Sequence, residues 1–152
     1  MIEGIDHVNL VVADLDVMTA FYRDVLAFSV TKQVTISGDW IATLVGLPGA
    51  VADVVYLDPR QGPRVELICY RQPVAHRPHG PSQVNTLGLR HIAFRVSDID
   101  RMVERIRLAG VNTNSPVMTV PQSQVTYAGG ANKRLVYFHD PEGNLLEMCE
   151  YR

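Results

Sequence analysis

Residues 6–18 read DHVNLVVADLDVM, and residues 90–102 read RHIAFRVSDIDRM. Set one over the other, the two stretches align His7 with His91 and Asp14 with Asp98, and the members of each pair are 84 residues apart. Similarity within a chain at a fixed offset indicates a repeated structural unit. The chain is therefore predicted to contain two related modules.

A second repeat lies at the other end of each module. Residues 64–70 read RVELICY and residues 145–151 read LLEMCEY, which aligns Glu66 with Glu147 at an offset of 81 residues. Each module thus opens with a histidine segment and closes with a glutamate segment. Residues 72–88 are rich in Pro and Gly and are predicted to be a linker. We expect one domain over residues 1–152, with module 1 at residues 1–71 and module 2 at residues 89–152.

The local patterns predict the same order of elements in both modules. An alternating β-branched strand at Ile5–Val12 is followed by a possible helix cap at Asp14, which Asp98 matches in module 2. Apolar residues at helical spacing follow both caps. Further strands are predicted at Ser29–Thr35, Val54–Leu57, Val65–Tyr70, Leu135–Phe138 and Leu145–Tyr151, whereas Ile36–Asp53 and Asn112–Arg134 show no clear period. The fold class is therefore predicted as α+β, with a βαβββ module occurring twice.

Composition limits the kinds of partner that the protein can have. The 152 residues are 47% apolar and 20% charged, with a formal net charge of −2 and no block of either sign. Such a surface does not favour nucleic acid or an anionic membrane as a partner. No apolar stretch is long enough to span a membrane, and the N-terminus resembles the start of a fold rather than a signal peptide. We expect a cytoplasmic protein that acts on a small molecule.

Four residues stand out as candidate metal ligands: His7, Glu66, His91 and Glu147. Side chains alternate across a strand, so each histidine is predicted on the less apolar face of its strand. A single strand histidine is usually a core residue, and a single strand glutamate usually faces water. A carboxylate in an apolar strand is costly unless it is paired or ligated. Because both residue types recur in register, the four side chains are predicted to surround one point if the modules pair by pseudo-two-fold symmetry.

Such a ligand set has a definite chemistry. Two imidazoles and two carboxylates neutralise a divalent cation and leave positions for water or a chelating substrate. An open cation of this kind can polarise a carbonyl group, and a carboxylate that loosens from it can act as a general base. Glu66 and Glu147 are therefore the candidate catalytic residues. We expect one Ni, Zn, Co, Mn or Fe ion.

The quoted segments resemble the vicinal-oxygen-chelate superfamily, which includes glyoxalases, bleomycin-resistance proteins and dioxygenases. The resemblance spans nearly the whole chain and includes FHDPEGNLLEMCE at residues 138–150. It implies a U-shaped, incomplete barrel made of two βαβββ modules around one divalent metal. It also implies that His7, Glu66, His91 and Glu147 are the ligands, a set similar to that of bacterial glyoxalase I.

The resemblance leaves several activities open. Our first expectation is a metal-dependent isomerase or lyase that moves a proton next to a carbonyl through a metal-bound enediolate. The alternatives are an epimerase similar to methylmalonyl-CoA epimerase, an extradiol-type dioxygenase and a non-catalytic protein that binds an antibiotic or another small molecule. We also expect a homodimer. Either one chain supplies all four ligands, or a dimer completes two sites by exchanging modules.

Four further residues are candidates for contact with a substrate. Asn9 shares the strand face of His7, and Arg95 shares that of His91. Trp40 lies in the irregular part of module 1 and is a candidate for lining a pocket. Arg134 follows a pair of glycines in module 2 and is a candidate for binding an anionic group.

Overall fold

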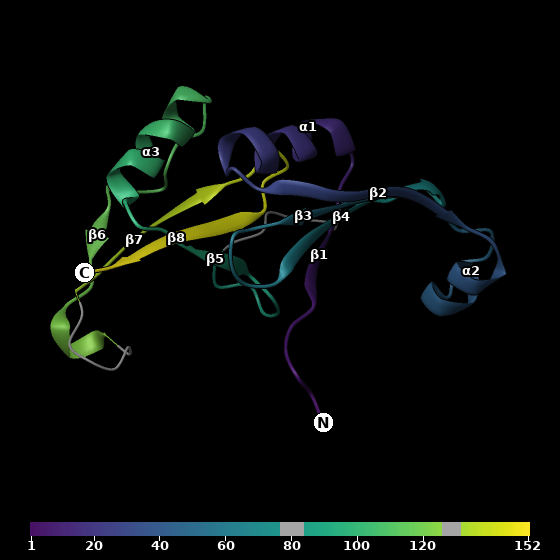
Figure 1. Ribbon diagram of the computed structural model, residues 1–152, viewed down its shortest axis with the longest axis horizontal. Helices are drawn as coiled ribbons and strands as arrows, with labels where there is room; N and C mark the ends of the chain where they lie inside the picture. The colour runs from purple at the N-terminus through teal and green to yellow at the C-terminus, as the bar shows by residue number, and fades with distance from the viewer. Residues whose placement is uncertain (77–83, 126–131) are drawn as a thin grey trace. The chain divides into compact units, whose positions relative to one another are not determined.

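The structure, a computed structural model, describes residues 1–76, 84–125 and 132–152. It divides into two compact units, Met1–Gly80 and Pro81–Arg152, and the division falls in the segment predicted as a linker. Residues 77–83 of that linker lie outside the described residues. Each unit holds one open four-stranded sheet and begins with a strand followed by a helix (Figure 1). The predicted α+β class is confirmed, whereas the organisation as a single domain stays a prediction.

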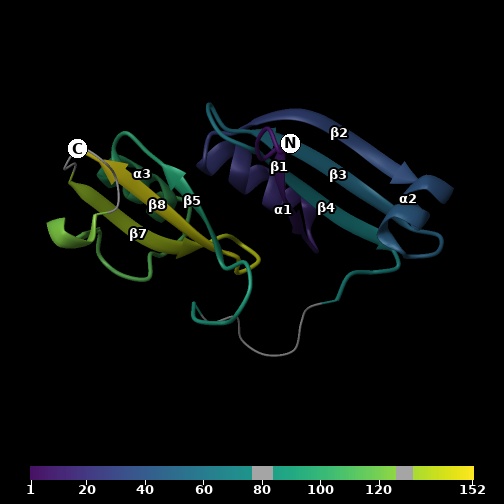
Figure 2. The same cartoon turned by 90° about the horizontal axis from the view of Figure 1, so that it is seen from below.

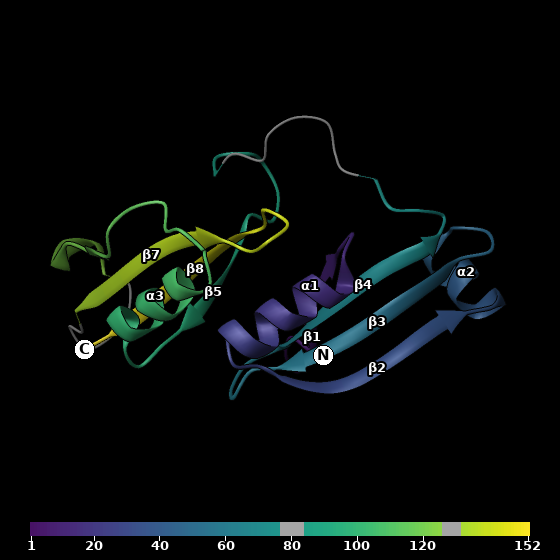
Figure 3. The same cartoon turned by 90° about the horizontal axis from the view of Figure 1, so that it is seen from above.

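The sheet of unit 1 has the strand order β1-β4-β3-β2. Its first strand runs parallel to β4, and the other neighbours are antiparallel. The helix α1 (Leu15–Ala20) lies across one face and contacts β4 and β3 (Figure 3). The strands are β1 (His7–Val11), β2 (Ser29–Ser37), β3 (Val51–Asp58) and β4 (Arg64–Gln72).

The helix of unit 1 begins where the sequence predicts and then departs from the α-helical pattern. Asp14 caps α1, because its carboxylate accepts a 3.0 Å hydrogen bond from the backbone N–H of Val17. A π-helical turn follows at Phe21–Val25, and the N–H of Leu26 bonds to the carbonyl of Phe21. The predicted helix is therefore α-helical only in its first part, although Met18, Tyr22 and Leu26 of its predicted apolar face are all buried. A π turn holds an extra residue, which changes the direction of every side chain after it.

A short helix occupies part of the segment that showed no period. The helix α2 (Asp39–Val45) connects β2 to β3 and lies beyond the end of β2 (Figure 1). Gly38 and Gly46 flank it with φ angles of 94° and 70°, a backbone region that favours glycine. No side chain caps its first turn, so the sequence carried no signal for its start.

Unit 2 repeats the arrangement with the strand order β5-β8-β7-β6. The helix α3 (Ile99–Leu108) begins at Asp98, which accepts a 3.0 Å hydrogen bond from the N–H of Arg101. The strands are β5 (His91–Arg95), β6 (Met118–Thr119), β7 (Lys133–His139) and β8 (Leu145–Tyr151), and a 3-10 turn covers Gln122–Gln124. The short strand and the 3-10 turn fall where no period was visible.

Much of the core of each unit lies between its helix and the adjoining face of its sheet, and in unit 1 a smaller buried cluster of Ala52, Val54 and Ile68 lies on the other face. In unit 1, Met18 and Tyr22 are fully buried together with Leu57 and Leu67 of the sheet. In unit 2 the fully buried side chains include Ile99, Ile106, Phe138, Leu146 and Met148. Because strand side chains alternate, the residues between these core positions lie on the opposite face of each sheet. Figure 2 views the unit 2 sheet from that opposite face.

Within the described residues, no helix combines the length and the apolar character that a membrane crossing requires.

Candidate metal centre

The first predicted pair of ligands meets on the face of the unit 1 sheet that α1 does not cover. His7 begins β1, and Glu66 lies on the neighbouring strand β4, opposite Asn9 in the register. The His7 Nε2 atom is 3.4 Å from Oε2 of Glu66. The Glu66 side chain is 13% exposed and that of His7 is 37% exposed, so the pair lies at the surface of the sheet and is open to a ligand.

The other ring nitrogen of His7 contacts a carboxylate. Nδ1 lies 2.8 Å from Oδ2 of Asp6, and Arg64 contacts the same oxygen at 2.5 Å. Hydrogen bonds from His7 and then from Arg64 lower the pKa of Asp6. A carboxylate at Nδ1 fixes the ring tautomer that leaves the Nε2 lone pair available, as is usual for histidine ligands of metals. With Nδ1 held by Asp6, the Nε2 atom of His7 is the one that could bind a cation.

Two further side chains hold the carboxylate of Glu66. The Tyr56 hydroxyl on β3 donates a hydrogen bond of 2.5 Å to Oε1, and the Asn9 amide donates one of 2.7 Å to Oε2. The hydrogen bond to Glu66, followed by burial, raises the pKa of Tyr56 to about 12. Tyr56 therefore remains a neutral donor over the physiological range, and its ring also meets the ring of His7 edge-on at 5.9 Å.

The second predicted pair has the same construction in unit 2. The His91 Nε2 atom on β5 is 3.5 Å from Oε2 of Glu147 on β8. Burial raises the pKa of Tyr137, and its hydrogen bond with Glu147 raises it further. The rings of Tyr137 and His91 meet edge-on at 5.3 Å. A histidine, a glutamate and a tyrosine thus recur together in both units.

The two groups differ in the residues around the glutamate. Ala93 stands in unit 2 where Asn9 stands in unit 1. Instead, the Lys133 Nζ atom on β7 is 3.6 Å from Oε1 of Glu147, whose residue is only 4% exposed. Burial lowers the pKa of the Lys133 ammonium, but the interactions with Glu147 and Tyr151 together have the larger effect, so the pKa is raised. The buried carboxylate therefore has a cation beside it, as a buried charge requires.

Two of these residues, Tyr56 and Tyr137, were not among the sequence-based candidates, and Lys133 was considered only, with Arg134, for contact with an anionic group. A signal for the tyrosines was present, because Tyr56 and Tyr137 are separated by the same 81 residues as Glu66 and Glu147. A tyrosine in a strand is ordinarily read as a packing residue, which conceals this role. Lys133 has no counterpart in unit 1, where Ala52 occupies the matching position, so the repeat could not identify it.

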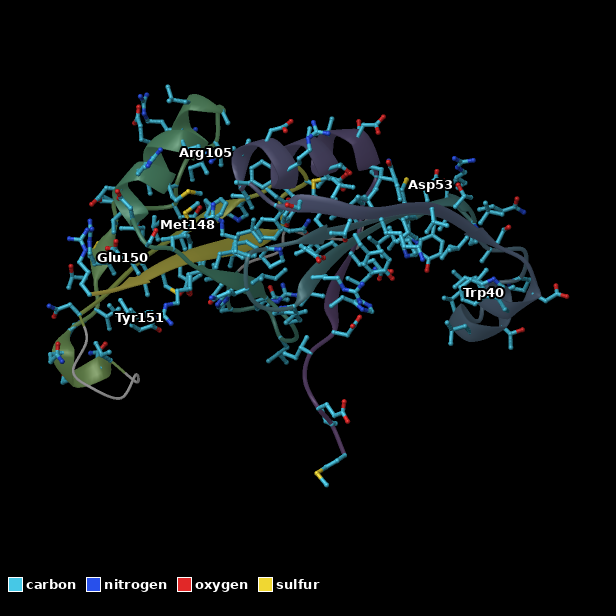
Figure 4. The ribbon with its side chains drawn as sticks, viewed as in Figure 1. Trp40, Asp53, Arg105, Met148, Glu150 and Tyr151 are labelled. Atoms are coloured by element: carbon cyan, nitrogen blue, oxygen red, sulfur yellow. The ribbon has the colours of Figure 1, made fainter. Side chains whose placement is uncertain are left out.

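The candidate substrate residues fall in different places. Asn9 contacts Glu66, and Arg95 lies on the face of its sheet that carries His91. Trp40 lies on α2, at the end of unit 1 away from β1 (Figure 4).

Arg134, the fourth candidate, lies on the α3 side of the unit 2 sheet. Its guanidinium binds Asp100 at 2.6 and 2.8 Å and Glu150 at 3.3 Å. This position places it on the opposite face from His91 and Glu147 and argues against the predicted contact with substrate.

An open hollow in unit 1 lies on the other face of the sheet from the His7–Glu66 pair. It adjoins the start of α1, and its polar lining includes Asp16, Gln33, Asp53 and Arg71. Asp53 and Arg71 form an ion pair there. The hollow is therefore separate from the candidate ligands.

The donor chemistry of both pairs fits a divalent cation. Imidazole nitrogen and carboxylate oxygen are ligands for Ni, Zn, Co, Mn and Fe, and both carboxylates are largely withdrawn from water. Over the part of the chain that the structure describes, no group of three His, Cys, Asp or Glu side chains gathers at one point. Each unit by itself therefore offers two ligands, which is half of the predicted set.

Comparisons with known proteins agree with this description of the two modules. The family model of the Glyoxalase/Bleomycin resistance protein/Dioxygenase superfamily matches residues 4–148. The uncharacterized protein YaeR of Escherichia coli (strain K12) is 28% identical over 151 residues, which cover 98% of this chain and 97% of YaeR.

Two solved structures share the fold. A glyoxalase family protein from Bacillus cereus is 24% identical, with a TM-score of 0.85 and coverage of 99% of this chain and 95% of its own. Lactoylglutathione lyase from Agrobacterium tumefaciens is 21% identical, with a TM-score of 0.59 and coverage of 97% and 93%. The chain therefore belongs to the Glyoxalase/Bleomycin resistance protein/Dioxygenase superfamily.

Proposed function

We propose that this protein is a metal-dependent isomerase or lyase that moves a proton next to a carbonyl group of a small molecule. The observation that supports it is the histidine, glutamate and tyrosine group that occurs once in each unit. Two nearly equivalent pairs, His7 with Glu66 and His91 with Glu147, would supply the four ligands of one divalent cation. The two pairs come from one chain or from two chains of a homodimer.

Held by His7, Glu66, His91 and Glu147, a divalent cation would supply Lewis acidity beside the substrate carbonyl. The protein supplies the proton transfer. The carboxylate of Glu66 or of Glu147 takes a proton from the carbon next to the carbonyl and returns it to the neighbouring carbon. Tyr56 and Tyr137 hold these carboxylates in place through their hydroxyl groups. Because the proton is returned, the reaction consumes no oxygen and needs no redox partner.

Metal stoichiometry tests the proposed centre. We would measure divalent metals in the purified protein by elemental mass spectrometry, beside the variants Glu66→Gln and Glu147→Gln. One shared cation predicts about one ion per chain, lost or much weakened in either variant. Glu104→Gln, on the exposed surface of α3, removes the same charge and should keep the ion. Two ions per chain, one of which survives each substitution, would show independent sites and contradict a shared centre.

Proton transfer is tested separately. Adducts of α-ketoaldehydes with thiols are the first substrates to assay, because a lactoylglutathione lyase shares the fold. In deuterated water, NMR should show product formation with deuterium entering at the carbon next to the carbonyl. Glu66→Gln and Glu147→Gln should abolish this exchange, and an oxygen electrode should record no uptake. Uptake of oxygen with a catechol, or binding without any turnover, would overturn the proposal.

The assembly state follows from the same proposal. Light scattering combined with size-exclusion chromatography should give a homodimer mass. Mixing inactive Glu66→Gln with inactive Glu147→Gln distinguishes the two sources of ligands. Activity returns on mixing only if partners exchange modules, because one of the two sites then contains neither substitution.

A further inference from the structure

Two cations flank one tyrosine ring on the ligand-bearing face of the unit 2 sheet. The Arg95 guanidinium carbon is 5.5 Å from the centre of the Tyr151 ring, and the Lys133 ammonium is 5.6 Å from it. Both distances lie within the range of cation–π attraction. The two side chains come from β5 and β7, the strands on either side of β8, which carries Tyr151.

Strand alternation places this group on the same face as the candidate ligands. His91 and Arg95 have equal parity on β5, as do Glu147 and Tyr151 on β8. Figure 4 shows Tyr151 on the side of β8 away from α3, whereas Glu150 points toward α3. Arg95 pairs with Cys149, which lies two residues beyond Glu147 on β8. The group therefore begins about 7 Å along the sheet from the row of the proposed ligand.

On the three strands β5, β7 and β8, cations outnumber carboxylates on this face. Among the described residues of β5, β7 and β8, Arg95 and Lys133 are the cations on this side, and Glu147 is the carboxylate. Glu150 lies on the opposite face, where Arg134 and Arg152 bind it. A metal ion bound to Glu147 would neutralise the carboxylate that lies beside Lys133. Arg95 and Lys133 would then be the charged side chains that these strands place beside the proposed ligand.

We propose that Arg95 and Lys133, with Tyr151 between them, bind an anionic group of the substrate, a carboxylate or a phosphate. This inference rests on the proposed function, because it assigns a class to that reaction's substrate. The guanidinium offers paired N–H donors that match either oxyanion, and the ammonium adds a point charge. The spacing along the strand favours an anion several bonds from the reacting carbonyl. The substrate is therefore a carbonyl compound with an acidic group at its far end.

An NMR titration of backbone amide signals tests this subsite in the full-length protein. The probes are inorganic phosphate and acetate, with neutral acetamide as the control and chloride holding the ionic strength constant. The experiment is run on the protein as purified and again after chelation and dialysis. Saturable shifts near Arg95 and Tyr151 are expected with an anionic probe and not with acetamide. The probe that binds more tightly identifies phosphate or carboxylate as the preferred group.

Variants then locate the binding. Arg95→Gln and Lys133→Gln should each weaken the apparent Kd about tenfold. Arg101→Gln on α3 removes the same charge elsewhere in unit 2 and should leave the Kd unchanged. Lys133→Arg keeps the charge and should keep binding, and the amide spectrum reports whether each variant is folded. Equal shifts with acetamide, or equal weakening in Arg101→Gln, would overturn the inference.

The two proposals can fail independently. The titration of the metal-free protein does not depend on a shared cation, and metal content is measured without any anion. If Arg95→Gln keeps its metal and still binds phosphate and acetate as the wild type does, the anionic subsite is refuted and the metal centre stands. If the protein never binds metal but Arg95→Gln loses anion binding, the subsite is supported and the metal centre is refuted.

Discussion

The Tyr56 hydroxyl donates a 2.5 Å hydrogen bond to Oε1 of Glu66, and unit 2 repeats this relationship with Tyr137 and Glu147. A carboxylate on a strand can adopt several rotamers, and the hydroxyl selects one of them. In metal sites such outer partners orient the ligands and typically alter metal affinity by roughly 10- to 100-fold. The tyrosines are therefore positioning residues for the proposed ligands.

Replacing either tyrosine should weaken metal binding without removing a ligand. Tyr56→Phe and Tyr137→Phe are each expected to lower affinity about tenfold, because the carboxylate loses its donor. Competition with a chromophoric chelator measures this directly. Tyr70→Phe, at the far end of β4 on the same face, is the matched control and should keep the wild-type affinity. Wild-type affinity in both Tyr56→Phe and Tyr137→Phe would refute a positioning role.

Asp6 should strengthen metal binding by His7, and unit 2 has no acidic residue at the matching position. Its carboxylate lies 2.8 Å from Nδ1 of His7, whereas Arg90 holds the matching position before His91. Asp6→Asn should weaken metal affinity several-fold, near the lower end of the usual range for outer partners, because Asp6 is largely exposed. Calorimetric titration of the metal checks this, with Asp39→Asn on α2 as a control of equal charge. An Asp39→Asn protein that loses as much affinity would point to general electrostatics instead.

The histidine and glutamate pairs were predictable because strand alternation and the internal repeat can be read from the sequence without tertiary information. The repeat could not place Lys133 beside Glu147, since Ala52 holds the matching position in unit 1. The π turn at Phe21–Val25 was also hidden, because its apolar residues fit an ordinary helical stripe. The short α2 lacks a side-chain cap and spans only two turns, so tertiary packing rather than local propensity determines it.

The carboxylate caps of α1 and α3 should contribute separately to stability. Asp98 accepts the backbone N–H of Arg101 and Asp14 that of Val17, both at 3.0 Å. Asp98→Ala should lower the free energy of unfolding by about 1 kcal/mol, the usual cost of removing a helix N-cap. Urea denaturation followed by circular dichroism measures it. Asp98→Asn retains an accepting oxygen and should recover most of the loss, whereas an unrecovered loss would assign the effect to charge.

Asp53 should give unit 1 a stability that depends on acid pH. The Thr35 hydroxyl donates a 2.6 Å hydrogen bond to Asp53, and Arg71 forms an ion pair with it on the α1 side of the sheet (Figure 4). The hydrogen bond from Thr35, and after it Arg71, lower the pKa of Asp53 below its ordinary 3.8 although burial opposes them. A depressed folded-state pKa means that this stabilisation is complete above the unfolded value and is lost as pH falls through the folded one.

Asp53→Asn imitates the protonated carboxyl and tests this dependence. At pH 7 the variant should be less stable than the wild type by about 1 kcal/mol, a modest value because Arg71 is largely exposed. As pH falls below 3.8, Asp53 in the wild type takes up a proton and becomes equivalent to the variant. The difference in unfolding free energy should therefore shrink toward zero in that window. A gap of constant size from pH 7 to pH 3 would mean that packing of the side chain, rather than its charge, stabilises this part of the sheet.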